Sequence, residues 1–301
     1  MPTSRISLPA FLIAVRGRPR WRVISLALLA SLVLSGCVAR IAYGQLDWLT
    51  RWYINSYFDL NASQERLAGE IIGRNLAWHR ATQLPLYAEH IRALRAGLGG
   101  PVSAAFIAQQ YEITLVLWDQ SLRHMSPDIG PLLLTLGDEQ LSGFFSEVEE
   151  QNAELREEYL GQGPEARRKK QDRSIIRAFR WFSGSLSRDQ EALVKSYTAD
   201  LHDLTEQWLE RRVAWQAAFR ALLENRSDNP DFEAQLTALL LDPNQFDSPE
   251  YRQRVAANRE IVFAMVAEVL SSGSPKQRKH LDGRLAGLAT DFDELARTPA
   301  R

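Results

Sequence analysis

The chain has 301 residues, of which 45% are apolar and 24% charged, as in an ordinary globular protein and unlike a disordered chain or a protein with many membrane spans. Its single cysteine, Cys37, excludes an intramolecular disulfide and every zinc or iron–sulfur site that needs several cysteines. The formal net charge is -1, but all five ionisable residues before Cys37 are arginine, which leaves 31 basic and 37 acidic residues after it. A mildly acidic body lacks the concentrated positive charge of nucleic-acid-binding proteins, so we expect no nucleic-acid partner.

Residues 1–36 have the layout of a secretory signal peptide. An arginine-rich stretch, residues 16–22, precedes an uncharged apolar run at residues 23–34. A run of this length is too short to span a bilayer, because a membrane-spanning helix needs about 20 apolar residues. We therefore predict that residues 1–36 are removed from the mature protein.

The apolar run ends in Leu34-Ser35-Gly36-Cys37, which resembles the lipobox of bacterial lipoproteins. The resemblance implies that the Cys37 thiol is joined to diacylglycerol, that the chain is cut before it, and that the new amino terminus is acylated, typically with palmitate. Several acyl chains anchor a protein stably where one alone would be marginal. The residue after the cysteine is Val38 and not aspartate. In that family, the lack of an aspartate at this position implies that the protein is anchored in the outer membrane, with its body facing the periplasm. An ordinary signal peptide with a chance cysteine is the alternative.

The segment 37–60 is aromatic and lacks a flexible Gly/Ser tether, so we expect the body to sit close to the bilayer. Placed at 100° per residue, its apolar residues form two stripes, and one of them contains Trp48 and Trp52. Two stripes indicate two burial partners. Both stripes could pack in the core, which we favour because aromatic stripes are mostly packing, or Trp48 and Trp52 could contact the membrane–water interface.

The remaining sequence is helically periodic with almost no strand signal, which predicts an all-α fold, an elongated bundle of long amphipathic helices. We expect a main bundle over residues 61–225 and C-terminal helices over 226–301 that pack on it. Residues 185–229 contain no glycine or proline and predict one helix of about 40 residues. Pro85 predicts a kink, and the segment 127–131 with its two prolines predicts a break.

Four helix starts share a pattern in which a glutamine follows the capping position by three residues. This is a capping box, in which the cap side chain accepts from exposed amides and the glutamine bonds back to the N–H group of the cap. The spacings between the four caps, 76, 50 and 87 residues, are too uneven for a solenoid. The participating residues are Asn61 with Gln64, Gly137 with Gln140, Ser187 with Gln190, and Ser274 with Gln277.

These starts resemble the LTxxQ motif of the Spy/CpxP-type periplasmic chaperones, small helical proteins that shield unfolded clients and tune envelope-stress signalling. The chain as a whole, with its lipobox, its aromatic segment and its glutamine-capped helices, resembles a family of uncharacterised proteobacterial lipoproteins, an all-helical domain of unknown function. This second resemblance implies a location and a helical fold but no activity.

Oppositely charged stripes flank a turn at residues 161–164. Folding the chain back there predicts an antiparallel hairpin, residues 147–160 against 166–181, whose facing charges set the register. The alternatives are two solvated faces with local ion pairs, each contributing about 0–1 kcal/mol, or a basic face offered to anionic lipid or lipopolysaccharide. The charged residues are Glu147, Glu150 and Glu154 before the turn and Arg173, Arg177 and Arg180 after it.

Catalytic motifs are missing from the sequence. The five histidines lie far apart, and there is no metal-ligand motif, nucleophile elbow or phosphate-binding glycine loop. We therefore predict no catalytic residue, no metal and no cofactor. The protein is expected to be a non-enzymatic binding or structural factor of the cell envelope, whose partners are membrane lipid, through acylated Cys37, and an unknown envelope protein or unfolded client. A lipidated Spy/CpxP-like chaperone or stress sensor is the alternative, and an envelope hydrolase is a third.

Overall fold

The structure, a computed structural model, describes residues 43–298, which are helical nearly throughout and contain no strand. The all-α fold class predicted from the sequence is confirmed. None of the helices in this part of the chain combines the length and the apolar character needed to cross a bilayer. The helices are α3 (Leu46–Phe58), α4 (Ala62–Trp78), α5 (Leu84–Gly97), α6 (Ala104–Leu134), α7 (Asp138–Leu160), α8 (Gly163–Ser183), α9 (Arg188–Ala199), α10 (Thr205–Glu224), α11 (Phe232–Leu241), α12 (Pro249–Ser271) and α13 (Pro275–Arg297).

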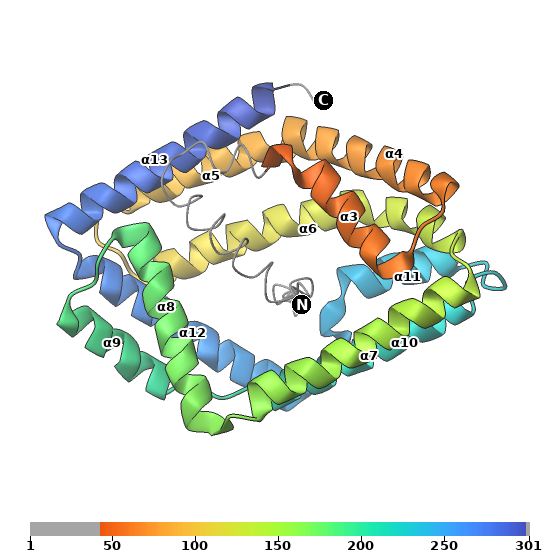
Figure 1. Cartoon of the computed structure of the whole chain (residues 1–301). Coiled ribbons are helices and arrows are strands. Elements are labelled where there is room, and N and C mark those ends of the chain that lie inside the picture. Colours follow the sequence, from red (N-terminus) through yellow and green to blue (C-terminus); the bar gives the residue numbers. More distant parts are fainter. Residues whose placement is uncertain (1–42, 299–301) are drawn as a thin grey trace, which may run out of the picture.

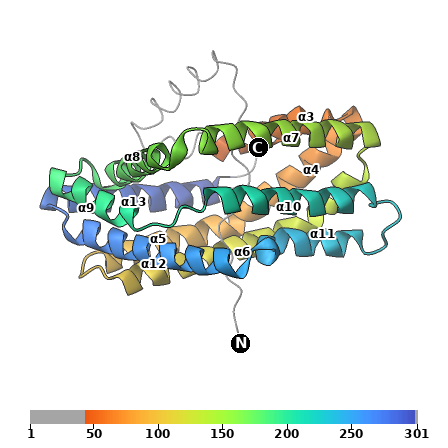
Figure 2. The ribbon, with the colours of Figure 1, turned by 90° about the horizontal axis from the view of Figure 1, so that it is seen from below.

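The helices are arranged as a closed, flattened ring (Figure 1). Figure 2 shows the ring edge-on. One of its two faces is formed by α3, α7 and α8, and the opposite face by α5, α6, α11 and α12. We call the first of these the α3/α8 face. Late helices close the ring against early ones, because α13 packs on α5 while α11 and α12 pack on α6.

The same helix contacts occur twice. In the first half, α3 packs on α4 and α7, and α4 packs on α6. In the second half, α8 packs on α9 and α13, and α9 packs on α12. The corresponding helices α3 and α8 end alike. Each is followed by a residue with positive φ, Asp59 at 45° after α3 and Gly184 at 80° after α8. Each half is therefore built on the same four-helix plan, α3-α4-α6-α7 and α8-α9-α12-α13.

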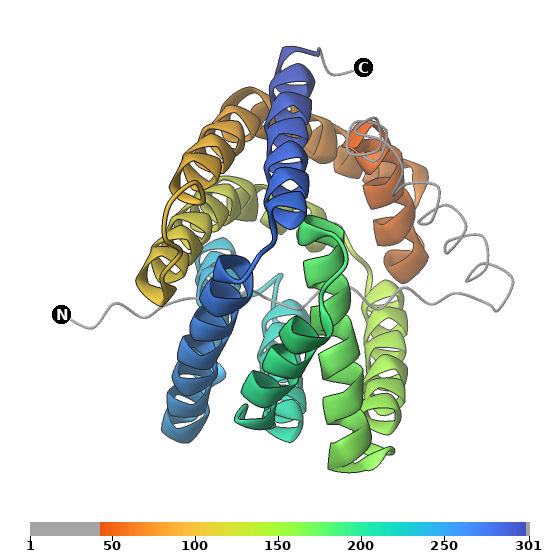
Figure 3. The same ribbon diagram turned by 90° about the vertical axis from the view of Figure 1, so that its left-hand side faces the viewer.

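Each half also gives one helix to the other. α5, between α4 and α6, packs on α13 of the second half, whereas α10, between α9 and α12, packs on α7 of the first half. The corresponding helices α6 and α12 pack on each other. Figure 3 shows the end of the ring at which α12 turns into α13 and α8 turns into α9. Because of this exchange, neither half is a separate packing unit.

Three groups of buried apolar residues follow this plan. The largest joins α4, α6, α7, α10 and α11 and includes Phe145, Leu223 and Leu236. The second, with Val194 and Met265, joins α8, α9 and α12. The third joins the exchanged helix α5 to α13. Burial of apolar surface, at about 25 cal/mol per Å², thus holds the two halves together as well as each half by itself.

The prolines act differently from one another. A five-residue π-helix, His79–Gln83, joins α4 to α5 just before Pro85, so the helix is interrupted where the sequence predicts a kink. The break predicted at residues 127–131 is wrong, because α6 continues through both Pro127 and Pro131. Tertiary contacts support α6 there. It packs on α4 and α11, and Asp128 accepts hydrogen bonds of 2.7 Å from Arg74 and 2.6 Å from Asn75 of α4.

The single long helix predicted over residues 185–229 is also wrong, because α9 and α10 are separated by residues 200–204. Asn258 of α12 accepts from the N–H of His202 at 2.8 Å and donates to its carbonyl at 2.9 Å. Asp203 accepts from the N–H of Thr205, near the start of α10, at 3.0 Å. These side chains satisfy backbone groups that a broken helix leaves free, so no glycine or proline is needed at the break.

Two leucines at helix ends test the assignment of the core. Leu223 in α10 is 0% exposed and Leu134 in α6 is 41% exposed. We expect Leu223→Ala to lower the free energy of unfolding by about 2–5 kcal/mol, because a buried leucine leaves a cavity when truncated. Leu134→Ala should cost under about 1 kcal/mol. Urea unfolding followed by circular dichroism measures both, and equal losses would contradict the burial of Leu223.

Candidate functional site

Three of the four predicted capping boxes are complete, and the one at Gly137 is half formed. The side chain of Asn61 accepts from the N–H groups of Ser63 and Gln64, at 3.0 and 3.1 Å, and Gln64 Oε1 accepts from the N–H of Asn61 at 3.0 Å. Gly137 has no side chain, so Gln140 supplies the contact there alone, at 2.9 Å. The boxes at α9 and α13 have the complete reciprocal geometry, formed by Ser187 with Gln190 and by Ser274 with Gln277.

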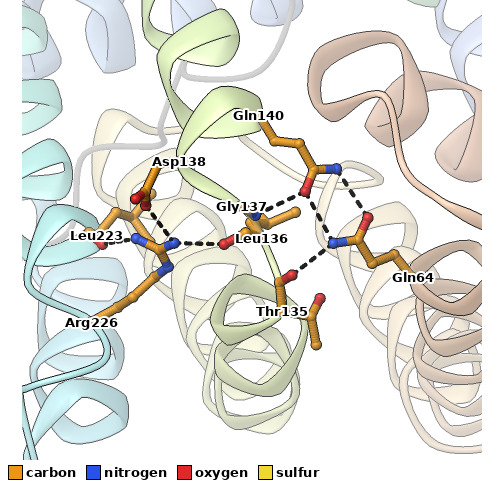
Figure 4. Close-up of polar contacts among 8 residues, drawn as sticks. All are labelled: Gln64, Thr135, Leu136, Gly137, Asp138, Gln140, Leu223 and Arg226. Atoms are coloured by element: carbon orange, nitrogen blue, oxygen red, sulfur yellow. Dashed lines mark hydrogen bonds and ion pairs between the residues drawn. The ribbon is translucent and has the colours of Figure 1, made fainter.

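The glutamines of α4 and α7 also bind each other (Figure 4). Gln64 Nε2 donates to Gln140 Oε1 at 3.1 Å, and Gln140 Nε2 donates to Gln64 Oε1 at 2.9 Å. Each amide also donates to a carbonyl oxygen two residues before the partner's cap, Gln64 to Thr135 at 2.7 Å and Gln140 to Asp59 at 3.1 Å. Gln140 has a shorter contact of 2.8 Å with the neighbouring carbonyl oxygen of Phe58. With the two caps, the pair uses both N–H groups and both acceptor positions of each amide.

The glutamines of α9 and α13 repeat this arrangement. Gln277 Nε2 donates to Gln190 Oε1 at 2.8 Å, and Gln190 Nε2 donates back at 3.4 Å. The outer contacts again reach the residues two positions before the partner's cap, the carbonyl of Ser185 at 2.9 Å and the hydroxyl of Ser272 at 3.2 Å. α4 and α7 begin at one end of the ring and α9 and α13 at the other (Figure 1). Each half therefore has one glutamine pair, which joins two interhelical turns.

Arg226 lies beside the first pair (Figure 4). It is 8% exposed and donates to the carbonyl oxygens of Leu223 at 2.9 Å and Leu136 at 2.6 Å, and to the Asp138 carboxylate at 3.0 Å. These contacts tie the turn after α10 to the start of α7. The polar segment 225–230 is thus anchored to the first half by a buried cation.

A second buried ionic contact lies farther along the chain. Arg211 of α10 forms an ion pair with Asp247 and donates to the carbonyl oxygen of Pro243 and the side chain of Asn244, both at 3.0 Å. Burial raises the pKa of the Asp247 carboxyl, and the Arg211 guanidinium offsets that rise only in part. The contact holds the short 3-10 helix Pro243–Phe246 against α10.

A hollow beside Gln190 and Gln277, lined by Leu186, Val269 and Leu281, has a volume of about 20 Å³, which suits a water molecule. Across residues 43–298, no three histidine, aspartate or glutamate side chains converge as metal ligands.

α3 presents an apolar patch to solvent. Trp48 is 62% exposed, Trp52 48% and Leu49 44%, and we call these three residues the aromatic patch. The opposite side of α3 packs on the rest of the molecule, where the rings of Tyr57 and Phe58 meet Phe144 of α7. The favoured interpretation of Trp48 and Trp52 as core residues is wrong, because α4 and α7 both contact that opposite side. Cys37, the predicted lipid site, lies outside the described residues.

The predicted charged hairpin is also wrong. α7 and α8 diverge from their turn (Figure 1), since α7 packs on α3 and α10 while α8 packs on α9 and α13. Arg180 pairs with Glu191 of α9, and Glu149 of α7 pairs with Arg220 of α10 at 2.9 Å. The apolar faces of both helices find other partners, and exposed ion pairs are too weak to override that packing. Glu147, Glu150 and Glu154 of α7 are therefore not in register with Arg173 and Arg177 of α8.

The outer side of α8 is basic and aromatic. Arg173, Arg177 and Trp181 follow one another at four-residue steps and are all exposed, and we call them the α8 stripe. Within the described part of the chain, neither arginine of the stripe forms an ion pair. Trp181 is 41% exposed and lies under the guanidinium of Arg284, 4.8 Å from its ring centroid. α8 lies on the same face of the ring as α3 (Figure 2).

Comparison with known proteins gives one result. The model of a family of unknown function, DUF6279, matches residues 56–252, more than half of the chain. No curated protein matches, and no solved structure matches. The match and the helical structure confirm the predicted resemblance to an uncharacterised, all-helical family.

The glutamine pairs predict strong coupling within a pair and none between pairs. We expect Gln64→Ala and Gln140→Ala each to destabilise the protein by about 1–3 kcal/mol. Each substitution removes hydrogen-bond partners from the amide of the remaining glutamine, which is buried in the case of Gln64 and half-buried in the case of Gln140. The double variant should cost less than the two losses added together.

The control is a cycle across the ring, with Gln64→Ala and Gln190→Ala, for which the losses should add within about 0.5 kcal/mol. Gln253→Ala, at an exposed glutamine of α12, should be nearly neutral. Urea unfolding measures all variants. Additive losses for Gln64 and Gln140 would show that the reciprocal amide contact contributes nothing.

Proposed function

We propose a function for this chain, which belongs to the DUF6279 family: it is an outer-membrane lipoprotein whose helical body faces the periplasm and acts by binding, not by catalysis. The location rests on the lipobox Leu34-Ser35-Gly36-Cys37 and on Val38 after it. The binding role rests on the exposed surfaces of the ring. Its partners are membrane lipid and an envelope protein.

One observation carries this proposal, namely that the aromatic patch follows the lipid site directly. Leu46, the start of α3, is nine residue steps after Cys37, and an extended chain covers at most about 3.5 Å per step. An acylated Cys37 would therefore hold α3 within roughly 30 Å of the bilayer. Tryptophan is enriched at the membrane–water interface, where its ring is apolar and its N–H is hydrated. The exposure of Trp48 and Trp52 on α3 fits that environment.

The buried polar groups support a rigid scaffold. Gln64 and Gln190 are buried and serve the joints between helices, Arg226 holds a turn, and Arg211 with Asp247 holds a short helix. A scaffold fixed in this way presents its outer surfaces in constant positions. Binding of a partner to those surfaces requires no change in the core.

Client shielding is a second candidate function, and exposed apolar side chains favour it. Ile113 and Val116 of α6 are 37% and 57% exposed, and Trp181 and Phe182 of α8 are about as exposed as Ile113. Apolar and basic residues together are suited to capture unfolded chains. However, α6 and α8 lie on opposite faces of the ring, so these residues do not form one continuous patch (Figure 2).

The lipid anchor is tested by mass. We expect the intact mature protein from membranes to begin at Cys37 and to carry acyl groups, because the lipobox directs cleavage before the cysteine. Cys37→Ala should leave the signal peptide attached and abolish the acyl mass. A wild-type protein that keeps residues 1–36 or has a free thiol would contradict the anchor.

Aggregation assays separate the two candidates. We expect the purified protein to leave the aggregation of an unfolded model client unchanged at every ratio, because its exposed apolar residues are scattered over the ring. Suppression that weakens with added salt would favour client shielding instead, because exposed charges are screened beyond about 8 Å at physiological ionic strength. Light scattering measures the outcome, and serum albumin serves as the inert control.

A further inference from the structure

We propose that the α3/α8 face is a membrane-contact surface, on which α3 supplies an aromatic contact and α8 binds the phosphate headgroups of anionic phospholipid. This inference rests on the proposed function, because the lipid on Cys37 brings the face to a bilayer. It adds a second, electrostatic contact on a helix far from the anchor in sequence. It also defines which way the ring lies on the membrane.

The two contacts occupy corresponding positions of the repeated helices. Trp48 lies eleven residues before Asp59, and Arg173 lies eleven residues before Gly184, the two positive-φ residues that end α3 and α8. Trp52 and Arg177 each lie seven residues before the same positions. Both pairs are exposed. The same outward side of the fold is therefore aromatic in one half and basic in the other.

Among the residues that the structure describes, Arg173 and Arg177 of α8 have no ionic partner, and neither does the exposed Arg168. The other cations of the helix are paired: Arg167 with Asp203, Lys169 with Glu165, Lys170 with Glu158 and Arg180 with Glu191.

Asp172, an acid beside the stripe, accepts a hydrogen bond from the Thr198 hydroxyl at 2.6 Å and is only partly exposed. No acid lies three or four residues from Arg173 or Arg177, so helix neighbours provide no carboxylate either. The two guanidinium groups are therefore available to an external anion.

A phosphate-rich bilayer surface fits these two arginines. Guanidinium binds phosphate oxygens with a planar fork of donors, and each basic residue near an anionic membrane contributes about 1 kcal/mol. Trp181 continues the stripe by one helical turn, and Phe182 packs against it at 4.3 Å between ring centroids. These two rings are 41% and 40% exposed, and aromatic rings beside basic residues suit the headgroup layer.

The arrangement of the face sets the orientation. α3 and α8 lie on one face with α7 running alongside (Figures 1 and 2). A body held only at α3 would pivot about its tether. A second contact on α8 places the whole face against the bilayer, so α5, α6, α11 and α12 face away from it. Those outer helices would be the part that meets the envelope partner.

The test uses the full mature lipoprotein in vesicles with a fluorescent label on a new cysteine. Acylation consumes the Cys37 thiol, so Ser174→Cys, an exposed position of α8 between the two arginines, supplies a single reactive thiol. Gln253→Cys, an exposed position of α12, supplies the matched label on a helix of the opposite face. Quenching by acrylamide, a neutral solute, measures access to water. The vesicles contain phosphatidylcholine alone, or three parts phosphatidylcholine to one part phosphatidylglycerol.

We expect phosphatidylglycerol to lower quenching of the Ser174→Cys label at least about twofold and to leave the Gln253→Cys label unchanged. High salt should reverse the protection. Arg173→Glu with Arg177→Glu should abolish it, and Arg173→Gln with Arg177→Gln should weaken it. Arg123→Glu with Arg254→Glu, the same charge change on the opposite face, should not affect it. Circular dichroism checks that each variant is folded.

Equal quenching of the Ser174→Cys label in both kinds of vesicle would overturn the inference. So would protection that persists in the Arg173→Glu, Arg177→Glu variant. Failure of the proposed function is visible separately, because an unacylated parent protein would itself take up the thiol label at Cys37. In that case, flotation of the unlabelled full chain with phosphatidylglycerol vesicles reads the α8 contact alone. Absence of charge-dependent flotation would then contradict it.

Discussion

The reciprocal contact between a buried and a half-buried glutamine amide is the interaction on which the arrangement of the helices depends. A helix start exposes N–H groups that need acceptors, and a buried primary amide needs four hydrogen-bond partners. Gln64 and Gln140 meet both requirements together, since each caps its own helix and fills the open positions of the other. The contact also fixes the relative position of two turns, because each amide reaches the residue two positions before the other cap. A single capping box specifies where a helix begins, whereas a pair specifies which helix begins beside it.

Repetition of this joint explains the ring. Each half carries one glutamine pair at its outer end, so the two ends are fixed locally, while the exchanged helices α5 and α10 connect them through apolar packing. Polar contacts thus determine geometry at the ends, and burial supplies most of the stabilisation between them. The exchange has a further consequence for stability. Removal of a core side chain in either half should also destabilise the other half, because α13 packs on α5 and α7 packs on α10.

Local signals in the sequence predicted what is local in the structure. The all-α class and the four helix starts followed from periodicity and from residues three positions apart, such as Ser187 and Gln190. The pairing of Gln64 with Gln140 could not follow, because it joins residues 76 apart and depends on the packing of whole helices. The break at residues 200–204 was missed for the same reason, since Asn258 on another helix satisfies it. The predicted hairpin is wrong because apolar packing, and not the pairing of exposed charges, determines the partners of α7 and α8. For Trp48 and Trp52, a helical stripe showed that two residues share a side but not whether another helix covers it.

The two halves differ in residue type at exposed positions, where packing does not require a particular side chain. Positions that hold the joints are filled by glutamine in both, because only an amide of that length supplies both donors and acceptors to the partner turn. Trp48 of α3 and Arg173 of α8 occupy exposed positions, so packing among the described helices does not decide between a ring and a cation there. That freedom allows one plan to present two chemistries on a single face. The helix next to the predicted lipid needs only apolar contact, since the tether already supplies proximity to the bilayer. α8 has no such tether, and a charge, whose attraction extends over a Debye length, is the contact that can act from a distance.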